Sequence, residues 1–458
     1  MRKFKRYERY KDSGVEWIGE IPEHWEIGRL KNSIKSCRNG IWGDEPQGDI
    51  NDVACIRVVD FNRTNMEIEV NNLTIRNVPV SKQKMYLLKR GDLLIEKSGG
   101  GEKQPVGFVT IFNHDIPAVY ANFIARMELE EEKVYSGFYK YVHYAMYSVR
   151  LNVKSIKQTT GIQNLDINYY FEESVIYPPL NEQKIIANFL DQKTAEIDGL
   201  IADKEKLIEL LQEKRQAIIT EAVTKGLNPN VRMKDSGVEW IGEIPEEWEL
   251  IKIKFVGTIY SGNGFKEELQ GKTEGDYPFF KVSDINGNGK LAISSNNYVD
   301  EDDVVNNGWN IIPKNSILFP KIGEALKKNH RKINACSCLI DNNIAAIKTN
   351  ERIIDFNYFY YYFCCVNAEW FVNPGAVPSI NNAYLKNFMV LLPSKNEQTA
   401  IANFLDQKTA EIDDLITEIK LQIQKLKEYR QSLISEAVTG KIDVREFQNK
   451  NEVIFRNE

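Results

Sequence analysis

Two stretches of the chain repeat apolar side chains at a spacing of seven residues. In the first stretch, one heptad position holds Leu190, Ile197, Lys204, Leu211 and Ile218, and the other holds Thr194, Ile201, Ile208, Arg215 and Ala222. In the second stretch, the same positions hold Leu405, Ile412, Ile419, Leu426 and Leu433, and Thr409, Ile416, Ile423, Arg430 and Ala437. A strict seven-residue repeat is typical of supercoiled helices. We therefore predict two long helices that form a coiled coil.

The ends of both stretches carry helix-boundary signals. Asn181 offers a side-chain acceptor to the first free amides of the first helix. Gly226 and Gly440 suit the left-handed conformation that commonly ends a helix. Because a whole globular block separates the two helices, we expect them to pair antiparallel, with one block at each end.

Three charged residues, Lys204, Arg215 and Arg430, interrupt the apolar seams. Long basic side chains can bury their aliphatic stems at such a seam and keep the charged head in water. Contact with helices of a partner protein is the alternative, and the sequence leaves both open.

The blocks outside the helices have a different pattern. Short β-rich runs alternate with turn signals, as in YLLKRGDLLIE (86–96), GFVTIF (107–112) and NSILFPKI (315–322). The aromatic runs FYKYVHYAMY (138–147) and FNYFYYYFCC (356–365) occupy matching places in the two blocks. Such runs favour core positions, with stacking on nucleic-acid bases as the alternative. Each block is thus predicted to be an α+β domain.

An internal repeat relates the two halves of the chain. KDSGVEWIGEIPEHWE (11–26) recurs as KDSGVEWIGEIPEEWE (234–249), and NEQKIIANFLDQKTAEIDGLI (181–201) recurs as NEQTAIANFLDQKTAEIDDLI (396–416). Between these segments only fragments align, such as LKRGDLLIEKSGG (88–100) with IPKNSILFPKIGE (312–324). The repeat is far longer than a solenoid unit, so it indicates a duplicated domain.

The sequence differences between the two copies are unevenly distributed along the repeat. Neutral drift after duplication should blur the ends of the repeat as well as its middle, whereas here the ends are nearly identical and the middles have diverged. We therefore expect one pseudo-twofold scaffold that presents two different binding surfaces. The predicted boundaries are 1–180 for the first α+β domain, 181–226 for the first helix, 227–395 for the second α+β domain, 396–440 for the second helix, and 441–458 for a tail that packs near the N-terminus.

Bulk properties restrict the class of protein. The chain has 458 residues, 42% of them hydrophobic and 27% charged, as in folded soluble proteins. Its longest apolar runs are shorter than a membrane span, and its six cysteines lack zinc-site spacing, so we expect reduced thiols in a cytoplasmic protein. The net charge of −6 disfavours strong autonomous binding to nucleic acid.

Motifs for catalysis are missing from the sequence. It contains neither an N-P-P-[YF] motif for amino-methyl transfer nor a GxxxxGK[ST] phosphate loop. The four histidines, His24, His114, His143 and His330, lack metal-ligand spacing. The lack of such motifs in a chain of this size favours a binding protein over an enzyme. We therefore expect no catalytic residue, metal or cofactor.

Several motifs together resemble the specificity (S) subunits of Type I restriction–modification systems. They are the K-D-S-G-V-E-W-I-G-E-I-P-E-x-W opening, the G-D-x-L-type strand at 91–95 and the P-x-x-N-E-Q-x-x-I-A-x-F-L-D boundary at 178–191. With the long helices and the duplication, the resemblance covers nearly the whole chain. Asn315 and Ser316 replace Gly91 and Asp92 in the second copy, so the second copy departs from the G-D-x-L pattern.

The resemblance implies two target recognition domains, each reading one half of a gapped site in double-stranded DNA. The helices would act as spacer and as docking surface for two adenine-methyltransferase (M) subunits, and restriction (R) subunits would join the full complex. AdoMet, ATP and Mg would then belong to the partners. A stand-alone DNA-binding or antirestriction-like protein is the alternative, and a coiled-coil adaptor without nucleic acid is a third possibility.

Candidate DNA contacts follow from the chemistry of recognition. Phosphates are bound by Lys, Arg and amide side chains, and base edges by Arg, Lys, Asn or Gln. Loops after the G-D-x-L-type strands and one loop before the first helix carry such residues. The candidates are Lys97, Ser98, Lys103, Gln104, Lys154, Lys157, Gln158 and Thr159 in the first domain, and Lys321, Lys327, Lys328, Asn329, Arg331 and Lys332 in the second.

Overall fold

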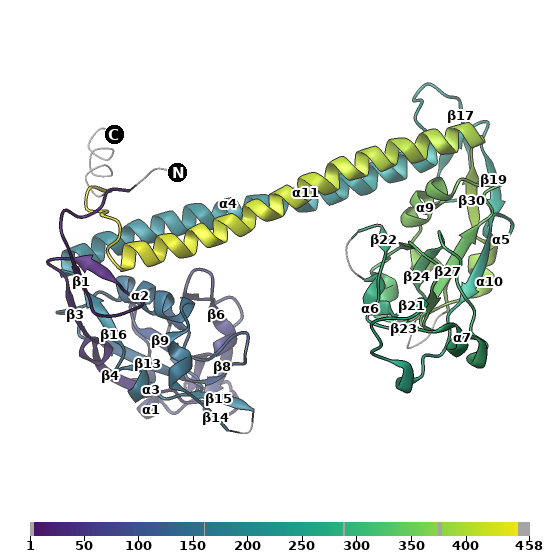
Figure 1. Ribbon diagram of the computed structural model, residues 1–458. Coiled ribbons are helices and arrows are strands. Elements are labelled where there is room, and N and C mark those ends of the chain that lie inside the picture. The colour runs from purple at the N-terminus through teal and green to yellow at the C-terminus, as the bar shows by residue number, and fades with distance from the viewer. Residues whose placement is uncertain (1–3, 160, 287–288, 374–377, 448–458) are drawn as a thin grey trace. The chain divides into compact units, whose positions relative to one another are not determined.

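Two long helices, α4 (Leu180–Lys225) and α11 (Lys395–Val438), run through the structure (Figure 1). The computed structural model describes residues 4–159, 161–286, 289–373 and 378–447. By its internal contacts the chain divides into two units, Met1–Glu205 with Lys420–Glu458, and Lys206–Ile419. Each unit contains one α+β domain and one half of each long helix.

A six-stranded sheet forms the centre of the first domain. Its strands lie in the order β4 (Ile34–Asn39), β13 (Ile124–Leu129), β9 (Leu93–Glu96), β11 (Val109–Ile111), β7 (Glu67–Ile68) and β6 (Phe61–Asn62). Two further sheets join β12 (Ala118–Tyr120), β5 (Asp52–Ile56) and β8 (Thr74–Asn77), and β10 (Ser98–Gly99), β15 (Ile162–Leu165) and β14 (Ile156–Thr159). The remaining elements are the pairs β1 (Tyr10–Asp12) with β2 (Glu20–Pro22) and β3 (Glu26–Arg29) with β16 (Ser174–Tyr177), and helices α1 (Val80–Tyr86), α2 (Ser136–Ser148) and α3 (Ile167–Tyr170).

A five-stranded sheet takes the same place in the second domain. Its strands lie in the order β20 (Gly257–Ser261), β27 (Ile344–Thr349), β24 (Ile317–Pro320), β25 (Lys332–Asn334) and β22 (Leu291–Ala292). Smaller sheets join β23 (Tyr298–Val299), β21 (Tyr277–Phe280) and β26 (Leu339–Ile340), and β28 (Val372–Asn373) and β29 (Ser379–Ile380). The remaining elements are the pairs β17 (Met233–Asp235) with β18 (Glu243–Pro245) and β19 (Glu249–Lys252) with β30 (Met389–Leu392), and helices α5 (Ile253–Val256), α6 (Val282–Ile285), α7 (Glu301–Asn307), α8 (Glu324–Lys327), α9 (Phe356–Cys365) and α10 (Asn382–Asn387).

The two central sheets share one pairing pattern. β4, β13, β9 and β11 pair antiparallel and β7 joins β11 in parallel. β20, β27, β24 and β25 likewise pair antiparallel, and β22 joins β25 in parallel. The diverged segments between the repeated ends therefore share one sheet topology despite their different sequences. The predicted fold class, two similar α+β domains with two long helices, is confirmed.

The aromatic runs lie in the cores of the two domains. Tyr139 and Tyr141 on α2 are buried, and so are Tyr361 and Tyr362 on α9. The core interpretation of these runs is therefore confirmed. The Tyr141 hydroxyl donates to Asp191 on α4 at 2.8 Å, and this hydrogen bond joins the core of the first domain to the helix. Its counterpart in the second domain runs from Tyr361 to Asp406 on α11 at 2.6 Å.

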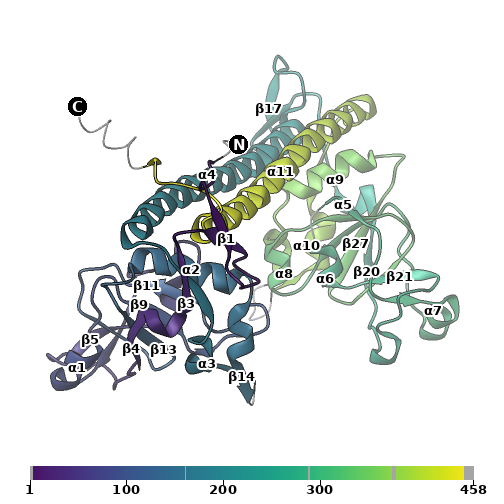
Figure 2. The ribbon, with the colours of Figure 1, turned by 60° about the vertical axis from the view of Figure 1, so that its left-hand side comes forward.

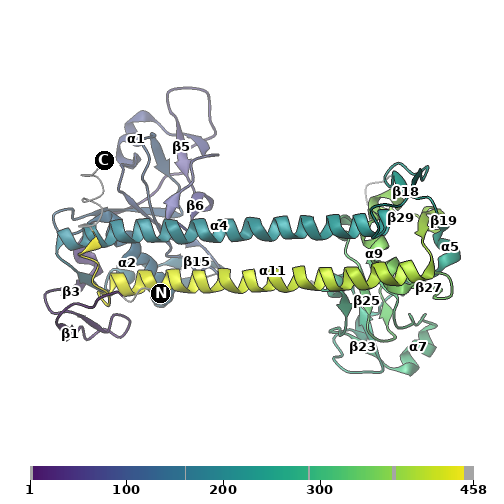
Figure 3. The same cartoon turned by 90° about the horizontal axis from the view of Figure 1, so that it is seen from above.

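The two helices pair antiparallel within the first unit. Arg430 donates from Nε to Asp198 Oδ1 at 2.9 Å, and Lys204 donates from Nζ to Gln422 Oε1 at 2.6 Å. Residue numbers thus rise along α4 as they fall along α11, as in the side-by-side helices of Figure 3. Buried seam residues of this unit are Leu190, Ile197, Ile201, Ile423 and Leu433, whereas Leu426 is half-buried.

The second unit repeats this pairing. Arg215 donates from Nε to Asp413 Oδ1 at 3.0 Å, at the repeat positions of Arg430 and Asp198. The buried seam residues here are Leu405, Ile412, Ile416 and Ile419, and the half-buried ones are Ile208, Leu211 and Ile218. The charged seam residues therefore bind polar groups of the opposite helix, which neither sequence-based alternative anticipated.

The repeated sequence segments contact one another. Trp25, from the first segment, donates its indole N–H to Glu182 in the first turn of α4 at 3.0 Å. Trp248 makes the same bond to Glu397 in the first turn of α11 at 2.9 Å. Both indoles are buried, and a buried indole N–H needs an acceptor. Each domain is thereby fixed to the start of one helix.

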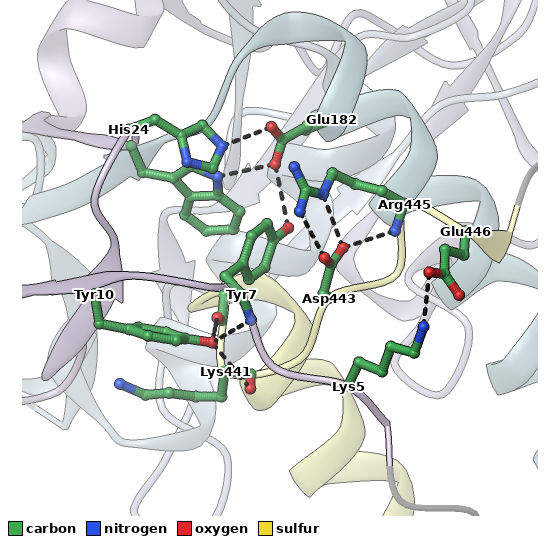
Figure 4. A network of polar contacts seen from close by, with 11 residues as sticks. Lys5, Tyr7, Tyr10, His24, Glu182, Lys441, Asp443, Arg445 and Glu446 are labelled. Atoms are coloured by element: carbon green, nitrogen blue, oxygen red, sulfur yellow. Dashed lines mark hydrogen bonds and ion pairs between the residues drawn. The ribbon is translucent and has the colours of Figure 1, made fainter.

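The tail and the N-terminal segment lie together in the first unit (Figure 4). Lys5 pairs with Asp443 through a backbone bridge, and its Nζ lies 2.8 Å from Glu446 Oε1. Tyr10 donates its hydroxyl to the carbonyl of Gly440 at 3.0 Å. Ile442 and Val444 are buried here as well. Residues 448–458 of the expected tail lie outside the described part of the chain.

Within the described residues, no helix combines the length and the apolar character that crossing a membrane would require.

The Arg430–Asp198 pair allows a test of how much the helix pairing stabilises the protein. The Arg430 side chain is 6% exposed and also donates to the Thr64 carbonyl, whereas the Arg215 side chain is 30% exposed. We expect Arg430→Ala to lower the free energy of unfolding by about 3 kcal/mol, because it removes a buried guanidinium and leaves half-buried Asp198 and the Thr64 carbonyl without that donor. The matched Arg215→Ala should cost about 1 kcal/mol or less, since its pair is solvent-screened. Urea unfolding of both variants measures the difference, and equal losses would contradict this assignment.

Candidate nucleic-acid interface

Two predicted DNA-contact segments of the first domain lie side by side in one small sheet. β10 begins at Ser98, directly after Lys97, and β14 contains Lys157. β15 lies between these strands, with Asn164 opposite both Ser98 and Lys157. The structure therefore brings together residues that are about sixty positions apart in the sequence. In Figures 1 and 2, β14 lies on the side of this domain away from the first half of α4.

The candidates of this domain differ in exposure and in partners. Those that are exposed are Lys103, Gln104, Lys154, Lys157 and Gln158, those that are half-buried are Lys97 and Ser98, and Thr159 ends β14. Lys157 Nζ lies 2.7 Å from Asp166 Oδ2. The hydrogen bond from Lys157, helped by the backbone N–H of Tyr169, lowers the pKa of Asp166. The Lys157 charge is thus partly neutralised within the domain.

A cleft of about 440 Å³ opens beside this sheet. Its walls include Asn39 from β4, Lys97, Lys157 and Asn164. The sequence indicated the two lysines but neither asparagine. Asn39 belongs to a strand far from the candidate loops in sequence, so its position follows only from the pairing of β4 with β13. Asn164 lies in β15, but an asparagine in a short strand carries no distinctive signal in the sequence.

The candidates of the second domain separate into surface and interior residues. Lys321 directly follows β24 and is half-buried, while Lys327 and Lys328 are exposed at the end of α8. Asn329 is half-buried and donates from Nδ2 to the Val366 carbonyl at 3.1 Å.

Arg331 and Lys332 do not lie on the surface, and this corrects the expectation from sequence. The Arg331 guanidinium lies 5.4 Å from the ring centroid of Phe319 and 4.6 Å from that of Phe363. It donates to Asn329 Oδ1 at 2.8 Å, and burial lowers its pKa to about 10. Lys332 belongs to β25 and is buried, which lowers its pKa as well. The run of charges that predicted a loop is thus the start of a core strand, and neither side chain belongs to the proposed interface.

The burial of Arg331 leads to a stability prediction. Arg331→Ala removes the packing between two rings and several hydrogen bonds, so we expect a loss of about 2–4 kcal/mol in the free energy of unfolding. The control Lys327→Ala removes an exposed ion pair with Glu324 and should leave the free energy of unfolding nearly unchanged. Thermal and urea unfolding measure the stability of both variants. An Arg331→Ala variant as stable as the wild type would show that the guanidinium is not part of the core.

The G-D motif has a backbone role in the first domain. Gly91 adopts a positive φ of 95°, and Asp92 accepts a hydrogen bond from the Lys89 amide at 2.7 Å. In the second domain Asn315 takes the same left-handed position with φ 58°. Asparagine tolerates this conformation better than other residues with a side chain. The substitution of Gly91 and Asp92 by Asn315 and Ser316 therefore preserves the turn.

Metal-ligating residues do not cluster in the described part of the chain: no group of three or more His, Cys, Asp or Glu side chains is placed to hold an ion. His143 is buried beside Tyr170, with 2.9 Å between its Nδ1 and the hydroxyl, and burial lowers its pKa to about 3.

The helices expose apolar side chains outside the seams. Leu200 on α4 is 50% exposed, and Leu415, at the same position of the repeat on α11, is 43% exposed. Each helix thus presents an equivalent leucine to solvent. Leu207, Leu210 and Leu421 are also exposed.

Comparison with known proteins connects this architecture to one family. The family model described as Type I restriction modification DNA specificity domain matches residues 23–210 and 245–425, one match for each half of the repeat. The chain is 25% identical to the putative type I restriction enzyme MjaX specificity subunit of Methanocaldococcus jannaschii, over 93% of this chain and 96% of that protein. It is 23% identical to the type I restriction enzyme EcoBI specificity subunit of Escherichia coli, over 71% of this chain and 70% of that protein.

Solved structures share the fold. A chain from a study of complex assembly and conformational transition of the type I R-M system aligns with a TM-score of 0.69 at 13% identity, over 91% of this chain and 98% of that one. The HsdS subunit from Thermoanaerobacter tengcongensis aligns with a TM-score of 0.50 at 14% identity, over 92% of this chain and 98% of that one. Because the family model matches most of the chain, the protein belongs to the Type I restriction–modification specificity subunits, which recognise DNA and are not the catalytic components of those systems.

Proposed function

We propose that the two α+β domains are target recognition domains, each of which reads one half of a gapped site in double-stranded DNA. The observation that carries this proposal is the combination of one shared topology with two different sets of surface side chains. A shared fold supports a shared docking geometry, and different side chains support recognition of different bases.

We also propose that two M subunits dock on the helices, one at each equivalent site. Leu200 and Leu415 support this, because exposed apolar side chains on a helix face suit a protein partner. The two sites follow from the repeat, since equivalent surfaces bind equivalent partners. R subunits would join the complex, and AdoMet, ATP and Mg would be bound by the partners.

The net charge of −6 supports dependence on these partners. Affinity for DNA rises with the number of phosphates that cations neutralise, and this chain has more acidic than basic residues. The stand-alone DNA-binding or antirestriction-like alternative requires tight specific binding by the chain alone, which its charge disfavours.

Co-expression with an M subunit tests the proposal. We expect a stable complex with two M copies and adenine methylation at a sequence of two defined parts separated by a gap of fixed length. Exchange of residues 27–178 for the corresponding block of a relative should change only one part of that sequence. Methylation mapping of wild type and chimera measures this, and a chimera that alters both parts would refute the modular assignment.

Substitution of the equivalent leucines tests M docking. Leu200→Glu and Leu415→Glu should each reduce the complex from two M copies to one, and the double variant should bind none, because a carboxylate opposes burial at an apolar interface. Leu421→Glu is the control, since Leu421 is equally exposed but its repeat counterpart is Lys206. Mass measurement of the purified complexes counts the copies. If the double variant still binds two M copies, the docking surface lies elsewhere on the protein.

A further inference from the structure

Lys97 and Lys321 occupy the same position in the two domains. The Lys97 amide donates to the Phe123 carbonyl at 2.8 Å, and its carbonyl accepts from the Leu165 amide at 2.8 Å. The Lys321 amide donates to the Asn343 carbonyl at 2.8 Å, and its carbonyl accepts from the Ile380 amide at 2.9 Å. The backbone therefore holds both lysines at the junction between the central sheet and the small sheet.

The side chains around this lysine differ between the domains. Asn39 lies opposite Ala125, which lies opposite Ile95, two residues before Lys97. In the second domain, Ser261 takes the place of Asn39. Ser261 lies opposite Ala345, and Ala345 lies opposite Phe319, two residues before Lys321.

A second varying position lies on the small sheet. Asn164 precedes Leu165, the residue that binds the Lys97 carbonyl, and Ser379 precedes Ile380, which binds the Lys321 carbonyl. One cation is thus common to both domains, and the polar residues at these two register positions change from asparagine to serine.

The two asparagines of the first domain are held in place by their oxygens. Lys97 Nζ donates to Asn39 Oδ1 at 2.9 Å, and Ser98 Oγ donates to Asn164 Oδ1 at 2.7 Å. Neither bond uses the amide NH2 group, which can donate to acceptors on base edges, and the oxygen retains a second lone pair. Because the partner of Lys97 is a neutral amide, its charge is not cancelled by this contact.

We propose that Lys97 and Lys321 are equivalent phosphate-binding residues, and that Asn39 with Asn164, and Ser261 with Ser379, contribute to the choice of bases in the two half-sites. This inference rests on the proposed function, and its ligand is double-stranded DNA. A lysine binds phosphate without regard to sequence, whereas asparagine pairs well with adenine and serine discriminates less. The common residue then supplies affinity and the changing residues supply specificity.

The test uses the complex with M subunits and duplex DNA that carries the site mapped for the wild type. Lys97→Ala and Lys321→Ala should each reduce the slope of log K against log salt concentration by about 0.9, the value for one lost phosphate contact, and leave the mapped sequence unchanged. Lys97→Arg should keep the wild-type slope because it keeps the charge. Lys84→Ala, an exposed lysine on α1, is the control.

The two asparagines are tested by replacing them with their second-domain counterparts. Asn39→Ser and Asn164→Ser, which introduce residues that the same backbone already accommodates, should relax or change the bases tolerated in one half-site only. A slope for Lys97→Ala and Lys321→Ala equal to that of Lys84→Ala would overturn the phosphate assignment, and an unchanged mapped sequence in both asparagine variants would overturn the base-reading assignment. If the wild-type complex methylates no two-part sequence, the proposed function itself fails.

Discussion

The hydrogen bond between a buried tryptophan and a glutamate at the start of a helix is the contact on which the rest of this architecture depends. Trp25 binds Glu182 and Trp248 binds Glu397, and each pair joins an α+β domain to a helix. A carboxylate in the first turn is also favoured by the helix dipole. Loss of the glutamate would leave the buried indole N–H without its acceptor. This dependence gives a physical reason why the two segments that contain these residues are nearly identical in both halves.

The middle of each domain is under weaker constraints on its side chains. Backbone hydrogen bonds define the central sheets, so their order and register persist as long as inward positions stay apolar. The turn before β9 and β24 illustrates this freedom, because Gly91 and Asn315 both adopt its left-handed conformation. Surface residues can therefore change while the sheet that presents them does not. A duplicated domain with this property can acquire a second binding specificity without a new fold.

The sequence predicted the elements that depend on periodicity and repetition. The heptads predicted α4 and α11, and the paired aromatic runs were correctly predicted to occupy core positions, which the structure places on helices α2 and α9. It failed where tertiary pairing decides the environment of a side chain. Arg331 and Lys332 lie in a charged run that resembles a loop, yet the pairing of β25 with β24 places them in the interior. Asn39 reaches Lys97 only through two successive strand pairings, which no local pattern in the sequence encodes.

The proposed interface separates affinity from specificity in a way that fits an acidic chain. With a net charge of −6, the protein gains little from diffuse attraction to DNA, so a few well-placed cations matter more. If Lys97 and Lys321 bind phosphates through backbone-defined positions, a change at residue 39 or 164 alters base preference without removing a cation. Affinity then stays nearly constant while the recognised sequence changes. If partner subunits dock on the nearly identical helix segments 181–201 and 396–416, they would meet the same scaffold whatever the DNA sequence, so recognition could diversify without loss of assembly.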